Sequence, residues 1–326
     1  MHHGFKPVWP FMSGWAQTLG AMYTPQRTLA RVDKFHHIIL PDKDVLVLCE
    51  NRPESWNEGG RVILLVHGLT GSAFSKDSGR LGAELLDLGY RVFRINLRNC
   101  GPGFGLSQNI YHAGQSQDTR TVLKFIGELC PGSPVTQIGF SLGANITLKM
   151  AGEDGENPTA GLDSVIAVSP PADLAASSRR LGCSDNRLFE QYFVQQLKRD
   201  VTGLTATNPK FLSPKFPEKM SLRDFDELLT APMGGFENAD DYYTRSSSLP
   251  LIEQISMRAL IIGSEDDPVV DMNPLKDITL KSHQMMILTK HGGHCGYLGF
   301  GAGGMSLRWL DRVIIKWLKT LVPKAI

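Results

Sequence analysis

The sequence has few of the features that indicate disulfide, metal or cofactor sites. Its cysteines show no C-x-x-C spacing and, being five in number, no even count that would suggest a disulfide framework. No group of His, Cys, Asp and Glu has the spacing of metal ligands. The glycine-rich stretch NLRNCGPG (96–103) has neither G-x-G-x-x-G spacing before a helix nor the lysine of a phosphate loop. We therefore expect no metal and no cofactor.

A strong charge bias and long apolar runs are also absent. The 326 residues carry a formal net charge of +1, which argues against nucleic acid or a polyanionic partner and favours a small neutral ligand. No apolar run approaches the roughly 20 residues that span a bilayer. The first residues lack the charged and apolar regions of a signal peptide. With the low cysteine content, these features predict a cytoplasmic protein and leave its oligomeric state open.

What the chain does contain is a repeated alternation of strands and helices. Unbroken apolar runs predict strands buried on both faces, and stretches with apolar residues at helical spacing follow them. The expected strands are 35–40, 44–50, 61–67, 90–97, 134–140 and 163–169, with two more after residue 256. This alternation predicts an α/β protein with a mostly parallel central sheet and helices on both faces.

Two segments depart from the alternation. Residues 175–256 contain helical fragments and loops rich in Pro, Gly and Asn, so we expect a helical cap over the carboxyl ends of the strands, with an oligomerisation arm as the alternative. Residues 1–30 are expected to pack on the body as an apolar segment, which leaves 31–174 and 257–326 as the core. The apolar residues of this segment fit a docked helix face, a cover over an acyl pocket or a weak contact with a lipid surface. They are Trp9, Phe11, Met12, Trp15, Leu19 and Met22.

The stretch GFSLGAN (139–145) contains the pattern G-x-S-x-G. Ser141 lies between an expected strand and an expected helix, the context in which this pattern mounts a nucleophilic serine on a tight turn. Gly139 and Gly143 remove side chains where the strand and the helix crowd that turn. A structural serine in a glycine-rich bend is the alternative. A nucleophile would also need a base, a carboxylate that orients the base, and N–H groups for the oxyanion.

Later turns contain those groups in the chain order Ser, Asp, His. GSEDDPVV (263–270) follows a strand, and we favour Asp267 as the orienting acid, with Asp266 as the alternative. KHGGHCGYLG (290–299) follows the last strand, and we favour His294 as the base, with His291 as the alternative. The sequence thus predicts a catalytic triad of Ser141, Asp267 and His294.

A second glycine-containing turn, HGLTG (67–71), supplies the expected oxyanion site. It follows the third strand, where one backbone N–H donor is expected, and the other donor is the amide after the nucleophile. These are the amides of Leu69 and Leu142. The substrate-pocket candidates are His67, which would also hold the loop, Gly68 and His112, for which a satisfied loop histidine is the alternative.

Several motifs together resemble one family. HGLTGSAFS, INLRNCGPG, YHAG with Asp118, GFSLGAN, SEDDP and GGHCGYLG occur in the order and approximate spacing of the YheT-like group of alpha/beta-hydrolase-domain esterases, and the resemblance covers nearly the whole chain. It implies the alpha/beta-hydrolase fold and carboxylic-ester hydrolysis by the three triad residues. The sequence departs from the usual pattern at Asn99 and Arg258, and neither position belongs to the triad.

The expected function is a cofactor-free serine carboxylesterase acting on a small-molecule ester with a short- to medium-chain acyl group. The family resemblance also implies two alternatives with the same triad, an alcohol O-acyltransferase and a lipase- or phospholipase-like enzyme. A non-catalytic binding protein on the same fold is a further alternative, but it would have no need of all three triad residues together.

Overall fold

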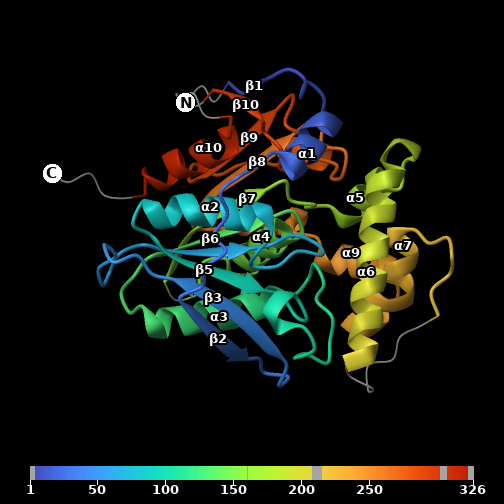
Figure 1. Cartoon of the computed structure of the whole chain (residues 1–326), viewed down its shortest axis with the longest axis horizontal. Helices are drawn as coiled ribbons and strands as arrows, with labels where there is room; N and C mark the ends of the chain where they lie inside the picture. Colours follow the sequence, from blue (N-terminus) through green and yellow to red (C-terminus); the bar gives the residue numbers. More distant parts are fainter. Residues whose placement is uncertain (1–3, 160, 208–214, 302–306, 322–326) are drawn as a thin grey trace.

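A central eight-stranded sheet organises the protein, and the computed structural model describes residues 4–159, 161–207, 215–301 and 307–321 of the chain (Figure 1). The strand order is β2-β3-β5-β4-β6-β7-β8-β9. The strands are β2 (Lys34–Ile39), β3 (Val45–Asn51), β4 (Val62–Val66), β5 (Arg91–Asn96), β6 (Val135–Phe140), β7 (Leu162–Val168), β8 (Arg258–Ser264) and β9 (Gln284–Thr289). Each coincides with a strand expected from the sequence.

The sheet is mostly parallel. β2 and β3 form an antiparallel edge, β3 pairs antiparallel with β5, and all the remaining pairs are parallel. Every residue of β4 and β6 is buried, because helices cover both faces of the sheet. The unbroken apolar sequence of β4 is the physical consequence of that double burial.

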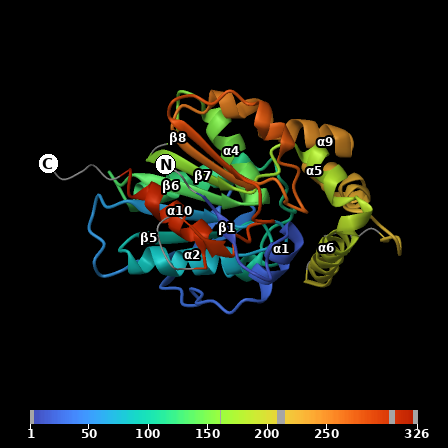
Figure 2. The same ribbon diagram turned by 90° about the horizontal axis from the view of Figure 1, so that it is seen from above.

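Helices pack on the two faces of this sheet. The side chains of α2 and α10 share one apolar core with alternate sheet residues, whereas those of α3 and α4 belong to the core on the opposite face (Figures 1 and 2). The bounds are α2 (Lys76–Asp87), α3 (Ser116–Leu129), α4 (Leu142–Asp154) and α10 (Trp309–Leu318), with short turns η1 (Gly101–Gly103) and η5 (Asn273–Asp277). The predicted alpha/beta-hydrolase architecture is therefore confirmed.

A group of helices lies between β7 and β8 in the chain and beside one end of the sheet in space (Figure 1). We call residues 175–256 the cap, and in the described part of that range every regular element is helical. The elements from β7 to β8 are α5 (Leu174–Leu181), η2 (Ser184–Asn186), α6 (Arg187–Thr207), α7 (Leu222–Phe225), η3 (Asp226–Thr230), α8 (Ala231–Gly234), α9 (Ala239–Ser246) and η4 (Leu249–Gln254). The division into a core and a cap remains our proposal.

The N-terminal segment is arranged differently from the expectation. β1 (Lys6–Pro7) pairs with β10 (Gly299–Phe300), and α1 begins only at Gly14 and ends at Tyr23. The six apolar residues therefore do not form one docked helix face. Trp9, Met12 and Leu19 are exposed. The buried residues of α1 are instead small or polar, namely Gly14, Gln17 and Thr18.

Candidate active site

Ser141 occupies a strained turn between β6 and α4. Its backbone has φ 51° and ψ −121°, a conformation that non-glycine residues rarely adopt. A Cβ at Gly139 would lie 2.2 Å from the Gly143 carbonyl oxygen, and one at Gly143 would lie 2.4 Å from the His67 carbonyl oxygen. Only glycine fits at either position, so the local sequence accounts for the turn that presents the serine hydroxyl.

The three predicted triad residues lie in hydrogen-bonding contact. His294 Nε2 is 3.0 Å from Ser141 Oγ, and His294 Nδ1 is 2.9 Å from Asp267 Oδ2. The other carboxylate oxygen of Asp267 accepts hydrogen bonds from the backbone N–H groups of Val269 and Val270, at 2.8 and 2.9 Å. Because Asp267 can only accept when ionised, the proton of the neutral imidazole belongs on Nδ1, which leaves Nε2 free to take the serine proton.

Burial and charge act in opposite directions on His294. Burial alone lowers the pKa of this imidazole, but the charge of Asp267 and its hydrogen bond raise it, and the net pKa lies above its ordinary value. A histidine with this environment is a stronger base than a free imidazole. It is therefore suited to accept a proton from a serine hydroxyl.

The two alternative residues form a neighbouring pair outside this chain of hydrogen bonds. Asp266 Oδ2 lies 3.2 Å from His291 Nδ1, and Asp266 Oδ1 accepts from the Gly293 backbone N–H at 2.9 Å. The His291 side chain is about half exposed, whereas His294 is nearly covered. Asp266 thus holds the loop that carries His294, and the geometry favours Asp267 and His294 as the working pair.

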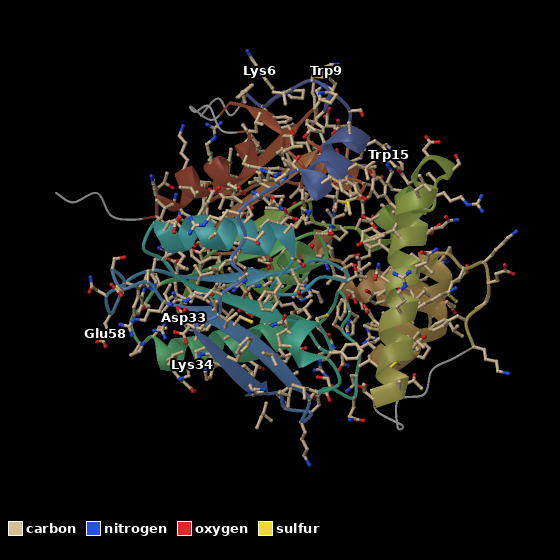
Figure 3. The ribbon with its side chains drawn as sticks, viewed as in Figure 1. Lys6, Trp9, Trp15, Asp33, Lys34 and Glu58 are labelled. Carbon is tan, nitrogen blue, oxygen red and sulfur yellow. The ribbon has the colours of Figure 1, made fainter. Side chains whose placement is uncertain are left out.

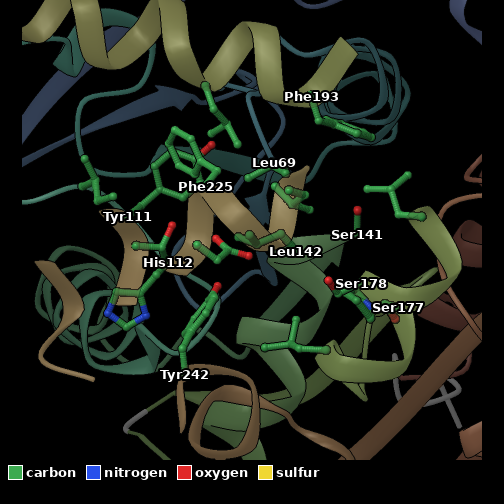
Figure 4. Close-up of a pocket in the computed structure, with 18 of the residues that line it drawn as sticks. Leu69, Tyr111, His112, Ser141, Leu142, Ser177, Ser178, Phe193, Phe225 and Tyr242 are labelled. Carbon is green, nitrogen blue, oxygen red and sulfur yellow. The ribbon is translucent and has the colours of Figure 1, made fainter. Parts of the chain in front are cut away.

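The residues that carry the expected oxyanion donors lie near Ser141. Leu142 is the first residue of α4, so its N–H is one of the helix-terminal donors that have no acceptor within the helix, and the helix dipole favours negative charge there. Leu69 lines the same cavity as Ser141 and Leu142, and Figure 4 shows the three close together. Gly68 allows this approach, because a Cβ there would lie 3.1 Å from Ser141 Cβ.

Of the three pocket candidates, the structure places one in the cavity. His67 is buried behind it, donating from Nδ1 to the Gly68 carbonyl at 2.8 Å and accepting from the Leu97 N–H at Nε2 at 3.1 Å. His67 thus holds the loop, and Gly68 lies against Ser141, although neither is among the residues that line the cavity. His112 does line the cavity, where burial and nearby positive charges lower its pKa to about 4. It lies across the view from Ser141 in Figure 4.

The cavity is formed jointly by the core and the cap and is mainly apolar. Its apolar lining includes Leu69, Ile110, Leu142, Leu174, Leu181, Phe193, Leu197, Val201, Leu204, Leu222, Phe225, Val269 and Val270. Two cap carboxyl groups also line it, those of Asp200 and Asp226. Burial raises the pKa of both carboxyls, that of Asp226 to about 6.

A cluster of one arginine and several carboxylates lies beside the cavity, and it was not predicted from the sequence. Arg98 lines the cavity, but its guanidinium is bound by Asp118 at 2.7 and 2.8 Å and also contacts Asp42 and Asp44. Only Asp118, near the start of a helix, carried a recognisable signal. The positive charge of Arg98 is therefore matched by these carboxylates rather than offered to a ligand.

The described ranges of the chain hold neither a candidate metal site nor a membrane-spanning helix. Within those ranges, no three His, Cys, Asp or Glu side chains are grouped so as to hold a metal ion. Over the same part of the chain, no helix combines the length and hydropathy needed to cross a bilayer.

Comparison with known proteins gives one family and several distant relatives. The model of the family described as the alpha/beta hydrolase fold matches residues 61–300. The chain is 28% identical to the Escherichia coli protein YheT, named as a candidate esterase, over 86% of this chain and 83% of that one. It is 26% identical to a monoacylglycerol lipase of Saccharomyces cerevisiae over 79% of this chain, which spans 59% of the relative. Among solved structures, an esterase of Pyrococcus furiosus superposes with a TM-score of 0.53 at 17% identity, covering 88% of each chain.

Proposed function

Because the chain belongs to the alpha/beta hydrolase fold family and is similar to esterases and lipases, we propose that it is a serine carboxylesterase. The single observation that carries the proposal is the continuous hydrogen-bonded series from Ser141 through His294 to Asp267, which opens into an apolar cavity. We propose these three residues as the catalytic triad.

The proposed reaction has two steps. Ser141 Oγ attacks the ester carbonyl carbon while His294 Nε2 takes its proton, and the amides of Leu69 and Leu142 donate to the oxyanion. The C–O bond to the alcohol then breaks, and His294 returns the proton to the leaving oxygen. A water molecule, deprotonated by the same imidazole, then attacks the acyl carbon of the acyl-enzyme. The bond from that carbon to Ser141 Oγ breaks, His294 returns the proton to Oγ, and the acid is released.

The lining of the cavity supports a neutral ester, and the short to medium acyl chain length is part of the proposal. Apolar side chains gain free energy by removing an acyl chain from water. The carboxyls of Asp200 and Asp226 disfavour an anionic substrate, since the charge of Arg98 is already paired with carboxylates.

The apolar lining also fits the alternative of a lipase-like reaction. The exposed apolar residues of the N-terminal segment lead us to propose a weak contact with a lipid surface. The cytoplasmic location stays a prediction.

The decisive test compares the wild type with Ser141→Ala. We expect a fluorophosphonate probe to label the wild type, which should also hydrolyse p-nitrophenyl esters. Ser141→Ala should lose labelling and lower turnover by about a million-fold, which leaves only the residual catalysis by the oxyanion site and by substrate binding. The matched control is Ser184→Ala, because Ser184 is an exposed serine of the cap. This variant should behave as wild type. Equal labelling and turnover of wild type and Ser141→Ala would overturn the proposal.

An alcohol acyltransferase is the second candidate, because the apolar, cap-lined cavity limits the water available to the acyl-enzyme. Adding ethanol to the ester assay separates the two reactions. Formation of an ethyl ester by the wild type, absent with Ser141→Ala, would show transfer, whereas release of free acid alone would leave hydrolysis.

A further inference from the structure

The loop that carries His294 is held in a strained conformation. Gly293, Cys295 and Tyr297 have φ values of 56°, 58° and 48°, in the left-handed region. Non-glycine residues adopt that region at a cost in free energy and persist there only where the surroundings fix them. The contacts of this loop therefore decide where the imidazole stands.

One of these contacts comes from the opposite end of the chain. Thr18 Oγ1, on α1, accepts a hydrogen bond from the backbone N–H of His294 at 2.9 Å and donates its own proton to the Gly14 carbonyl at 2.7 Å. The donation within the helix orients the hydroxyl lone pairs toward the loop. Thr18 is buried, so water does not compete for this amide.

The preceding residue fixes the far end of the same loop. Gln17 Oε1 accepts from the Leu298 N–H at 2.6 Å, and Gln17 Nε2 donates to the Leu298 carbonyl at 3.0 Å. This side chain is fully buried. Both hydrogen-bonding groups of Leu298 are thus satisfied by one amide, as they would be by a neighbouring strand.

The backbones of α1 and the loop approach so closely that little adjustment is available. A Cβ added at Gly14 would lie 1.7 Å from the Asp266 carbonyl oxygen, and one at Gly293 would lie 2.3 Å from the Gly14 carbonyl oxygen. On the other side, Ser264 Oγ donates to the Gly293 carbonyl at 2.9 Å. The loop is therefore confined from both sides, and Thr18 supplies the contact to the His294 amide itself.

We propose that Thr18 is a positioning residue for the catalytic base, so that α1 belongs to the active-site machinery as a clamp on the His294 loop. The inference rests on the proposed function, because it assigns His294 the role of base. A positioning role for Thr18 and a mere packing role predict different effects of substitution. Loss of the Thr18 hydroxyl should displace the imidazole from Ser141 and leave the cavity unchanged.

The test uses two substitutions at Thr18 on α1 and one at Thr24, the residue that follows this helix. Thr18→Val keeps the shape and removes the acceptor, and Thr18→Ser keeps the acceptor. Thr24→Val is the matched control, because Thr24 Oγ1 donates to the carbonyl four residues earlier, at 2.6 Å to Gly20, whereas the hydrogen bond to the His294 N–H comes from Thr18. The wild type and each variant are assayed with p-nitrophenyl butyrate across pH.

We expect Thr18→Val to lower kcat by about 10- to 100-fold, as a displacement near 1 Å does. KM should stay within about twofold, since the cavity is untouched. Thr18→Ser should retain kcat within about threefold, and Thr24→Val should match the wild type. The proposal is overturned if Thr18→Val keeps the wild-type kcat or changes KM alone. It is also overturned if Thr24→Val lowers kcat as much as Thr18→Val does.

A second measurement separates this proposal from the assignment of function. The proton shared by His294 Nδ1 and Asp267 should give a downfield ¹H NMR signal in the wild type and Thr18→Ser, and a lost or exchange-broadened signal in Thr18→Val. If the wild type neither hydrolyses esters nor labels, the proposed function fails, yet this signal still tests the clamp. Thr18→Ala replaces Thr18→Val if the valine variant does not fold, with the same expected outcomes.

Discussion

At the scale of single residues, the protonation of His294 sets the pH dependence of the proposed reaction. The base must be neutral to accept the serine proton. Burial lowers the pKa of His294, but the charge of Asp267 and its hydrogen bond together raise that pKa above its ordinary value. Activity should therefore be lost as pH falls through a midpoint above that of a free imidazole. We expect Asp267→Asn to lower kcat by about 10⁴-fold, because the imidazole tautomer is no longer fixed, and to shift the midpoint downward. The measurement is kcat/KM from pH 5 to 9.

Asp266→Asn is the paired control for that prediction. Asp266 accepts from Gly293 and meets His291, so its loss weakens the loop without changing the charge that faces His294. We expect a smaller loss of kcat and an almost unchanged midpoint. A larger loss than that of Asp267→Asn would contradict the assignment of the acid.

The sequence was sufficient to predict the residues that meet in the triad, for a physical reason. Ser141 follows β6, Asp267 follows β8 and His294 follows β9, and the carboxyl ends of parallel strands lie along one edge of a sheet. The choice between Asp266 and Asp267 was different in kind. Adjacent residues point in different directions, so only the turn geometry after β8 could show which one faces the imidazole.

At the scale of elements, the alternating pattern predicted the strands well and α1 poorly. A strand covered on both faces is favoured to be mainly apolar, as β4 is, so its sequence identifies it. The docked face of α1 is small and polar because its partner is a strained backbone loop that exposes N–H and C=O groups. Nothing in residues 14–23 indicates a partner more than 270 residues later in the chain.

Several apolar side chains of α1 and of the segment before it are exposed. They lead to a prediction about lipid surfaces. Trp9 is 86% exposed and Leu188, on α6, is 70% exposed. The two elements are joined by the Trp15 and Phe189 rings, whose centroids are 4.2 Å apart, and Figure 3 labels Trp15 on the side of α1 toward the cap. We expect Trp9→Ala to weaken binding to phosphatidylcholine vesicles by about three- to tenfold in sedimentation, because burial of such a ring contributes about 1.5–3 kcal/mol when complete.

Phe35→Ala provides the control for the vesicle measurement. Phe35 is 48% exposed on β2, which forms one edge of the sheet, whereas α1 lies near the opposite edge (Figure 1). Its loss should leave vesicle binding unchanged. Equal weakening by both substitutions would indicate nonspecific adhesion, and no measurable binding of the wild type would remove the lipid contact from the proposal.

At the scale of the whole molecule, the cavity combines a core that supplies the nucleophile with a cap that supplies negative charge. Asp200, on α6, has a pKa raised by burial alone, and no described side chain forms an ion pair with it. Asp226 adds a second carboxyl, ionised above a pKa of about 6. At pH 8 the cavity should therefore discriminate against anionic acyl groups by Coulomb repulsion.

Paired substrates measure this discrimination. We expect the wild type to prefer p-nitrophenyl butyrate over mono-p-nitrophenyl succinate, whose acyl end carries a carboxylate. Asp200→Asn should reduce the preference in kcat/KM by about three- to tenfold, since removing one charge several ångströms away in a partly buried site changes the interaction by about 1 kcal/mol. Asp185→Asn, an exposed acid of the cap, should leave the ratio unchanged. An unchanged ratio in Asp200→Asn would show that the chain selects esters by the shape of the cavity and not by the charge of the cap.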